Sequence, residues 1–417
     1  MTPWTELDVA LAHLLAQAQP LTRTEVVPCE AAAGRVLAQA VVSALDVPPA
    51  DNSAMDGYAV RLADWALPSA GSPLPALPVS QRVAAGEVPQ PLQPGTLARI
   101  FTGATLPPGA DAVQMQELAE PQADGTVRLL SLPRPGEWIR RQGEDIATGA
   151  TVLPVGRRLS AFDLGLAASV GVPALQVVAR PRVAVLCSGN ELVAPGAVAP
   201  QALPAGQIFN SNRPVLLALL RALGCAVSDL GVAPDDLAQT QALLAEAARD
   251  HDLVLASGGM SVGEEDHMKA AVQALGELAL WQIAMKPGKP FAFGRLRRGA
   301  RAGQAWFIGL PGNPVSSSVC SLLLVRPFVL ALQGVTGEAL AWPAQPLRAD
   351  FAVPKAGKRR EFLRVRRNPQ GGLDLFAHQG SGVLTSLAWA DGLVDLPAGQ
   401  TVAPGDAVRY IALSDLG

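Results

Sequence analysis

The feature that most constrains the fold of this chain is a regular alternation of apolar runs and helical patterns between residues 182 and 328. Three of the runs have the length and composition of buried strands: "RVAVLC" (182–187), "DLVLAS" (252–257) and "AWFIGL" (305–310). Segment 211–224 and the segment that begins at Asp235 or Asp236 each start with helix-capping residues, and their apolar residues then recur at the spacing of a helix. Strands that alternate with helices in this way predict a mostly parallel sheet with helices on both faces.

The flanking segments read differently. Residues 51–144 contain short β-type runs between Pro- and Gly-rich turns, which predict a small β-domain, and the runs after about residue 328 predict a second one. Residues 160–178 have a helical pattern followed by an extended one. The N-terminal stretch predicts a helix that Thr2 caps, with Pro3 in its first turn.

Length and composition narrow the class of protein. A chain of 417 residues exceeds the size of a single core, and 49% hydrophobic residues exclude a disordered chain. The net charge of −3 gives no reason to expect nucleic acid or an anionic membrane as partner. No signal peptide is indicated at the N-terminus, and turn residues interrupt the uncharged stretch 302–325, so we expect no membrane span.

The four cysteines are far apart in the sequence and include no C-x-x-C pair. Their mostly apolar surroundings indicate buried thiols in a reducing compartment. Four scattered histidines do not provide the clustered ligands of a zinc site.

Four loops follow predicted strands, where parallel α/β sheets place their ligands: "CSGNEL" (187–192), "SGGMSVGEEDH" (257–267), "MKPGKP" (285–290) and "LPGNPVSS" (310–317). The glycine-rich loop allows backbone N–H groups and hydroxyls to approach a phosphate or another oxyanion. The residues expected to do so are Ser257, Gly258, Gly259, Ser261 and Gly263. A tight turn whose glycines serve backbone geometry alone is the alternative.

Two further loops favour an anion. Lys286 and Lys289 flank a Pro-Gly turn, and two ammonium groups at one strand end suit a doubly charged ligand. The stretch Pro311, Gly312, Asn313, Pro314, with Ser316 and Ser317, predicts a helix start whose N–H groups and hydroxyls add contacts. A solvated turn and simple helix capping are the alternatives.

Carboxylates lie in the same set of loops, at Glu191 and Asp266. Carboxylates beside a phosphate-binding loop would repel the phosphate unless a cation lies between them. Mg²⁺ can do so, because it binds through one or two carboxylates together with phosphate oxygens. The residues therefore predict a nucleotide or pyrophosphate-containing substrate with Mg²⁺. Solvation at the surface is the alternative for both carboxylates.

Six stretches stand out along the chain: "DNSAMDGYAVR" (51–61), "IFTGATLPPGADAV" (100–113), "RRQGEDI" (140–146), "SGGMSVGEEDHMK" (257–269), "AMKPGKPFAFG" (284–294) and "GLPGNPVSS" (309–317). Together and in this order, they resemble the molybdopterin molybdenumtransferases, the MoeA family, and they are similar to the E domain of gephyrin. The resemblance covers essentially the whole chain.

The resemblance implies a multidomain α/β plus β architecture. It comprises a helical dimerisation arm from residues 1–50 and 145–178, an inserted β-domain at 51–144, a doubly wound, mostly parallel α/β molybdopterin-binding domain at 179–328, and a C-terminal β-barrel-like domain at 329–417. It also implies a cytoplasmic homodimer that takes adenylylated molybdopterin and molybdate and, with Mg²⁺, releases AMP and the molybdenum cofactor. The active cleft would lie between subunits, and a molybdopterin adenylyltransferase would be a further partner.

Matched residue by residue, the resemblance implies catalytic roles for the following set: Asp56, Thr102, Asp145, Glu191, Asp235, Asp266 and Lys286. Of these, Glu191, Asp235 and Asp266 would be the metal ligands, and Arg364 and Ser381 would bind substrate from the last domain. The chain departs from the family pattern at Ala50, where an aromatic residue is usual, and at Gln282, where a lysine is common.

Two other functions stay open at this point. A molybdopterin adenylyltransferase would resemble only the 180–330 region, and a non-catalytic scaffold of the gephyrin type would favour an attached partner-binding region or a long linker. The basic run 355–367 invites nucleic-acid binding, but its alternation favours a strand with one charged face at a hairpin or a cleft rim.

Overall fold

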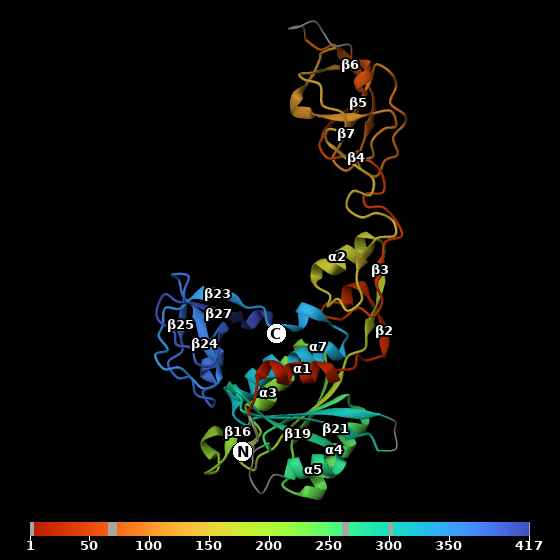
Figure 1. Cartoon of the computed structure of the whole chain (residues 1–417). Helices are drawn as coiled ribbons and strands as arrows, with labels where there is room; N and C mark the ends of the chain where they lie inside the picture. Colours follow the sequence, from red (N-terminus) through yellow and green to blue (C-terminus); the bar gives the residue numbers. More distant parts are fainter. Residues whose placement is uncertain (1–3, 66–72, 261–266, 300–302, 417) are drawn as a thin grey trace.

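A computed structural model describes residues 4–65, 73–260, 267–299 and 303–416. The molecule is elongated, with the inserted β-domain at the far end of a narrow arm and the C-terminal domain beside the α/β body (Figure 1). The expected Ser261, Gly263 and Asp266 lie outside the described residues.

The body is built on a seven-stranded sheet. Its strands, in spatial order, are β1 (Trp4–Thr5), β19 (Gly276–Ile283), β21 (Pro290–Arg297), β22 (Gln304–Leu310), β18 (Leu253–Ser257), β14 (Arg182–Cys187) and β17 (Ala226–Val232). The predicted parallel pairing is confirmed from β22 to β17. β21 is instead antiparallel to both β19 and β22, because the chain reverses between β19 and β21 at the Pro-Gly turn and forms a hairpin.

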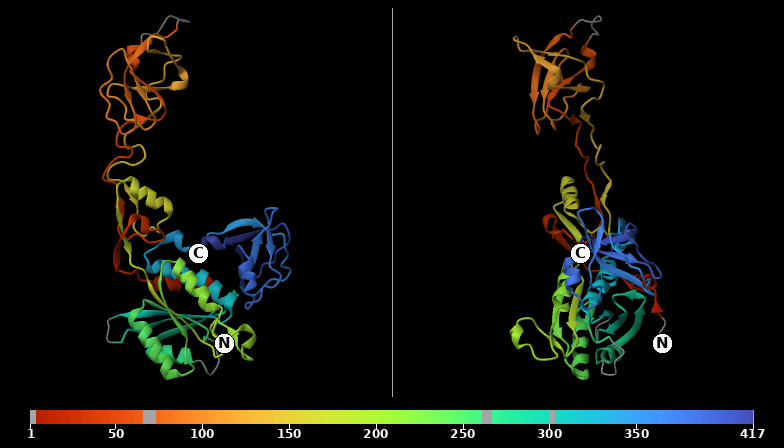
Figure 2. Two further views of the ribbon diagram at one scale, coloured as in Figure 1. Left: turned by 180° about the vertical axis from the view of Figure 1, so that it is seen from behind. Right: turned by 90° about the vertical axis from the view of Figure 1, so that its left-hand side faces the viewer.

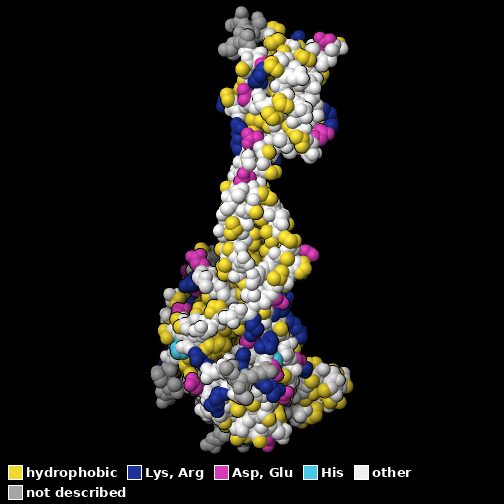
Figure 3. Space-filling view, turned by 90° about the vertical axis from the view of Figure 1, so that its right-hand side faces the viewer, with side chains coloured by type: hydrophobic (Ala, Val, Ile, Leu, Met, Phe, Trp, Pro, Cys, Tyr) yellow, Lys and Arg dark blue, Asp and Glu magenta, His cyan; other side chains and the backbone are white. Residues whose placement is uncertain are grey.

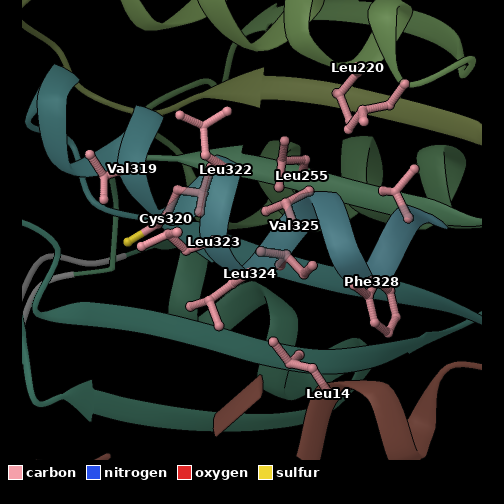
Figure 4. Close-up of a cluster of buried hydrophobic side chains, with 14 of the residues drawn as sticks. Leu14, Leu220, Leu255, Val319, Cys320, Leu322, Leu323, Leu324, Val325 and Phe328 are labelled. Atoms are coloured by element: carbon pink, nitrogen blue, oxygen red, sulfur yellow. The ribbon is translucent and has the colours of Figure 1, made fainter. Parts of the chain in front are cut away.

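Helices cover both faces of this sheet, as predicted. On β14, Val183 and Val185 join one core while Ala184 and Leu186 join the other, since neighbouring residues of a strand point to opposite faces. The first core (Figure 4) receives α1, α3, α6 and α7, and the second receives α4 and α5. The helices are α1 (Leu7–Gln17), α3 (Asn212–Ala222), α4 (Leu237–Asp250), α5 (His267–Leu275), α6 (Pro314–Cys320) and α7 (Arg326–Leu332).

A π-helical turn, η5 (Ser321–Val325), joins α6 to α7. Pro327 cannot donate a backbone hydrogen bond, and a wider turn before it accommodates that loss. Pro314–Leu332 is apolar and long enough to cross a membrane, but it is wholly buried in the core. It is therefore the central helix of the body, in agreement with the expectation of no membrane span there.

The N-terminal segment differs from its expected place. Instead of a helix that begins near Thr2, the described chain starts with strand β1, and α1 begins at Leu7 with Glu6 as its N-cap. Both elements pack on the body: β1 extends the sheet beside β19, and Leu14 is fully buried in the body core. The apolar face of α1 is thus buried in the core of the body, and the arm begins only after α1.

The arm consists of an outgoing and a returning chain segment. Strand β2 (Thr24–Pro28) pairs antiparallel with β13 (Ala174–Val178), and β3 (Val41–Val42) pairs with β12 (Thr151–Leu153). Helix α2 (Ala161–Ser169) starts at a capping box in which Ser160 and Asp163 exchange hydrogen bonds. The two segments continue side by side to the β-domain (Figure 2).

The inserted β-domain holds a six-stranded sheet with a small core on each face. Its strands, in spatial order, are β8 (Ala112–Met115), β5 (Gly57–Val60), β7 (Leu97–Ile100), β6 (Ala76–Val83), β10 (Thr126–Leu129) and β9 (Ala119–Pro121). At its base, β4 (Asn52–Ser53) pairs with β11 (Ile139–Arg140), where the chain enters and leaves.

The C-terminal domain is a curved antiparallel sheet around its own core. Its strands are β23 (Gln345–Arg348), β24 (Arg360–Arg367), β25 (Leu373–Leu375), β26 (Gly392–Leu396) and β27 (Ala407–Ala412), and α8 (Thr385–Trp389) packs beside β24. A bridge between Ala349 and Leu373 links the two ends of the sheet, which gives the expected barrel-like form. Strand β20 (Met285–Lys286) of the body adds to β24, so backbone hydrogen bonds join the two domains.

Asp252, just before β18, is a buried carboxylate whose ion pairs connect the start of the arm to the body. Its carboxylate accepts two hydrogen bonds from Arg23, at 3.0 and 2.7 Å, one from the Arg182 N–H at 2.9 Å, and one from Arg298 at 3.2 Å. Burial by itself would raise the pKa of Asp252, but the hydrogen bonds and the charges of the arginines outweigh it and hold the pKa below its ordinary value.

We expect Asp252→Asn to lower the free energy of unfolding by about 2 kcal/mol at neutral pH, because it removes the charge of a buried carboxylate that accepts hydrogen bonds from three arginines. The depressed folded-state pKa means that this stabilisation is present above the unfolded value of about 3.9 and is lost as the pH falls through the folded value. Urea denaturation at several pH values measures the difference, which should shrink in acid. Glu120→Gln, at an exposed site in the β-domain, is the control, and an equal loss in both variants would contradict the assignment.

Candidate active site

A hollow of about 860 Å³ lies where the loops after β14, β18 and β22 meet the C-terminal domain. Twelve of the residues expected from the sequence line it: Glu191, Asp235, Gly258, Gly259, Lys286, Lys289, Pro311, Gly312, Asn313, Pro314, Ser316 and Ser381. Ser257 lies beneath the floor and is 1% exposed, as is Ser317. The carboxyl ends of the central parallel strands thus bring these loops together.

The glycine loop is shaped by close approach of two backbones. Gly258 and Gly259 have φ values of +87° and +68°, and a Cβ on Gly258 would lie 2.2 Å from the Ser188 carbonyl oxygen. The Gly258 N–H donates to the Leu310 carbonyl at 3.1 Å, so it is already paired within the sheet. At Gly258 the glycine therefore serves backbone geometry, which was the alternative interpretation of this loop.

Asn212, at the start of α3, ties two of the loops together and was not among the expected residues. Its side-chain amide donates to the Ser257 hydroxyl at 2.8 Å and to the Gly312 carbonyl at 2.7 Å. Ser257 in turn donates to the Pro311 carbonyl at 3.3 Å. In the sequence, Ser211 and Asn212 indicate only a helix cap. The linking role of Asn212 could not be predicted, because Ser257 and Gly312 are far from it in the chain.

One side of the hollow is cationic. Lys286 lies 3.2 Å from a Glu361 carboxylate oxygen, and Lys289 lines the wall next to it. Arg359, from the segment before β24, also lines the hollow and donates to the Met285 carbonyl at 3.1 Å. The sequence reasoning missed Arg359, although it stands in the basic run that was interpreted as a cleft rim.

Arg364, expected to bind substrate, is 1% exposed and does not line the hollow. It donates to the Phe362 and Gly380 carbonyls and to the Ser386 hydroxyl, and burial lowers its pKa to about 10. In this buried position it supports the loop that carries Gly380 and Ser381. The Ser381 carbonyl accepts from the Val315 N–H at 3.0 Å, in the first turn of α6.

The opposite side is acidic. Asp235 accepts a 2.5 Å hydrogen bond from Asn190 and lies 3.7 Å from His267 Nε2, and Glu191 also lines this wall. The described residues hold no group of three side chains with metal-binding chemistry. Mg²⁺ does not require one, because it binds through one or two carboxylates with phosphate and water oxygens. The donors present therefore fit a hard cation held jointly with a phosphate ligand.

Three expected residues lie far from the hollow. In the β-domain, the N–H and hydroxyl of Thr102 both donate to Asp56 at 2.8 Å and lower the pKa of its carboxyl. Asp145 is exposed where the chain returns from the β-domain. Because that domain stands at the far end of the arm (Figure 1), the structure brings Asp56 and Thr102 together but does not bring them to the hollow of the same chain.

We expect Gly258→Ala to destabilise the body by about 2 kcal/mol and to distort the glycine loop, because the new Cβ combines a positive φ with a backbone clash. Gly149→Ala is the matched control, since Gly149 has a φ of +86° with nothing within 4 Å of its Cβ position. Urea denaturation compares the two. Equal losses of stability would show that the approach of Ser188 has no cost beyond the backbone strain.

Three family models match the chain: "MoeA N-terminal region (domain I and II)" at residues 5–171, "probable molybdopterin binding domain" at 184–331 and "MoeA C-terminal region (domain IV)" at 346–413. The molybdopterin molybdenumtransferase of Haemophilus influenzae is 39% identical over 95% of this chain and 97% of its own length. That of Bacillus subtilis is 33% identical over 90% and 86%.

Among solved structures, a molybdopterin biosynthesis MoeA protein from Pyrococcus horikoshii OT3 superposes with a TM-score of 0.83 at 26% identity, covering 98% of this chain and 100% of that one. Both the sequence and the fold thus match over nearly the full length. The chain belongs to the molybdopterin molybdenumtransferase (MoeA) family.

Proposed function

We propose that the hollow binds adenylylated molybdopterin and molybdate, and that the protein inserts molybdenum into molybdopterin with Mg²⁺-dependent release of AMP. The observation that supports this is the arrangement of an acidic and a cationic wall around one hollow of suitable size at the strand ends. The curated relatives are named molybdopterin molybdenumtransferases.

Each wall has a distinct task in this proposal. Asp235 and Glu191, with Asp266 from the segment outside the described residues, would hold Mg²⁺ against the phosphates of the adenylylated substrate. The bound ion supplies Lewis acidity at the phosphate. Lys286, Lys289 and Arg359 hold the oxyanion and stabilise the negative charge that develops on the departing AMP. Asn212 keeps the loops between the walls in place.

We expect Asp235→Asn to raise the Mg²⁺ concentration for half-maximal AMP release at least tenfold, because an amide is a far weaker ligand for Mg²⁺ than a carboxylate. Asp236→Asn is the matched control: Asp236 caps α4 by accepting from the Gln239 N–H at 2.8 Å, and asparagine caps a helix equally well. Magnesium titrations of AMP release measure both. An unchanged requirement in Asp235→Asn would remove Asp235 from the metal site.

We also propose that two copies pair through the arm, so that Asp56 and Thr102 reach the hollow of the partner. The arm surface in Figure 3 carries many hydrophobic side chains and few charged ones. Exposed hydrophobic residues of the arm include Val26 (71%), Val42 (52%), Val155 (61%) and Phe162 (88%). Such a patch marks an interaction site, and the distance of Asp56 from its own hollow favours a second copy as occupant.

We expect Phe162→Asp to convert the dimer to monomer in sedimentation velocity, because the interface would bury an unpaired charge. AMP release should fall at least tenfold with it if Asp56 acts across the interface. Val88→Asp is the control, since Val88 is 89% exposed on the β-domain, away from the arm. A monomeric variant with full activity would retain the dimer proposal and reject the shared site.

A cytoplasmic location is part of the same proposal. All four cysteines are free and buried, which suits a reducing compartment. A molybdopterin adenylyltransferase would supply the adenylylated substrate there.

A further inference from the structure

A second hollow, of about 570 Å³, opens beside the first one. The two share Lys286 and Arg359, and Trp4, Lys358 and Glu361 complete the lining of the second. Three of these five side chains carry positive charge. Trp4 has no role in the function proposed above, although it lines the second hollow beside the two shared residues and is 47% exposed.

Backbone pairing fixes the place of Trp4. In β1, Trp4 is paired with Gln282 of β19, and the Thr5 carbonyl accepts from the Ala284 N–H at 2.8 Å. The indole is therefore held at the edge of the sheet, next to the turn that carries Lys286 and Lys289.

Two cations pack on this indole. The Arg359 guanidinium carbon lies 4.9 Å from the Trp4 ring centroid, and Lys289 Nζ lies 5.4 Å from it. Both are within the distance of about 6 Å at which a cation is attracted to an aromatic face, and tryptophan is the strongest partner for this interaction. Trp4 thus contacts one cation from the body and one from the C-terminal domain.

An aromatic partner orders a cation without neutralising it, which a carboxylate partner would do. Lys286, Lys289, Lys358 and Arg359 repel one another. Within the described part of the chain, Lys286 is the one of these four cations that has a carboxylate partner, Glu361 at 3.2 Å. A carboxylate orders a cation by neutralising it, whereas the indole carries no net charge. Arg359 and Lys289 are therefore ordered while their full positive charge remains available to an anion.

We propose that Trp4 is a positioning residue that holds Arg359 and Lys289 toward the oxyanion substrate at the junction of the two hollows. This inference rests on the proposed function, and it deepens that function by assigning the first strand of the chain to oxyanion binding.

The test compares Trp4→Leu, which keeps an apolar side chain in β1, with Trp4→Phe, which keeps an aromatic face. Molybdate binding is measured by calorimetry on the full-length protein, and AMP release is measured as kcat and KM for molybdate. We expect Trp4→Leu to weaken molybdate binding about three- to tenfold with kcat little changed, and Trp4→Phe to recover most of the affinity. Trp138→Leu, an exposed tryptophan of the β-domain, is the matched control.

A double-mutant cycle separates positioning from packing. If Trp4 acts through Arg359, Trp4→Leu should have a smaller effect in an Arg359→Gln background. Wild-type affinity in Trp4→Leu, equal affinities of the Leu and Phe variants, or full additivity with Arg359→Gln would each overturn the inference. A wild-type protein that binds no molybdate would overturn the proposed function itself, which distinguishes the two failures.

Discussion

The register of three parallel strands is the constraint on which the rest of this structure depends. Cys187 of β14 is paired with Ser257 of β18, and Ser257 is paired with Leu310 of β22. Each strand therefore ends at the same level of the sheet, and the three following loops begin side by side. The strands pair in this way because their side chains are buried on both faces. A shift of one strand would move its loop out of the hollow and reverse its two faces.

The C-terminal domain supplies the remaining residues of the hollow. Backbone pairing of β20 with β24 attaches this domain at the turn that carries Lys286. In addition, the Ser381 carbonyl accepts a hydrogen bond from the Val315 N–H in the first turn of α6. At the same junction, Arg360 bridges Asp8 of α1 and the buried Asp395, with its pKa raised by hydrogen bonding to Asp395. The cationic wall is thus assembled from two domains, and its geometry depends on how firmly they are joined.

Much of this site was predictable because it consists of loops directly after strands. Alternating apolar runs locate the strand ends, and Gly-, Pro- and Ser-rich segments there are typical of ligand-binding loops. Arg364, which the resemblance implies as a substrate-binding residue, shows what the pattern leaves undecided. In the run "KRREFLRVRR", Leu363 and Val365 face the core of the domain, and Arg364 lies on the opposite face of β24, covered by the segment of Gly380 and by Ser386. Arg359, before the strand, lines the hollow. The pattern indicates a strand but not which face the rest of the protein will cover.

By itself, the sequence determined the alternation of strands and helices in the doubly wound body and most of the loops that form the hollow. These follow from local periodicity and turn chemistry, which act between residues close in the chain. Only the tertiary structure decided that β1 and α1 join the body, that Asn212 links two loops, and that Trp4 meets Lys289 and Arg359. Those contacts join residues far apart in sequence, and they exist only once the sheet register and the domain junction have brought their backbones together.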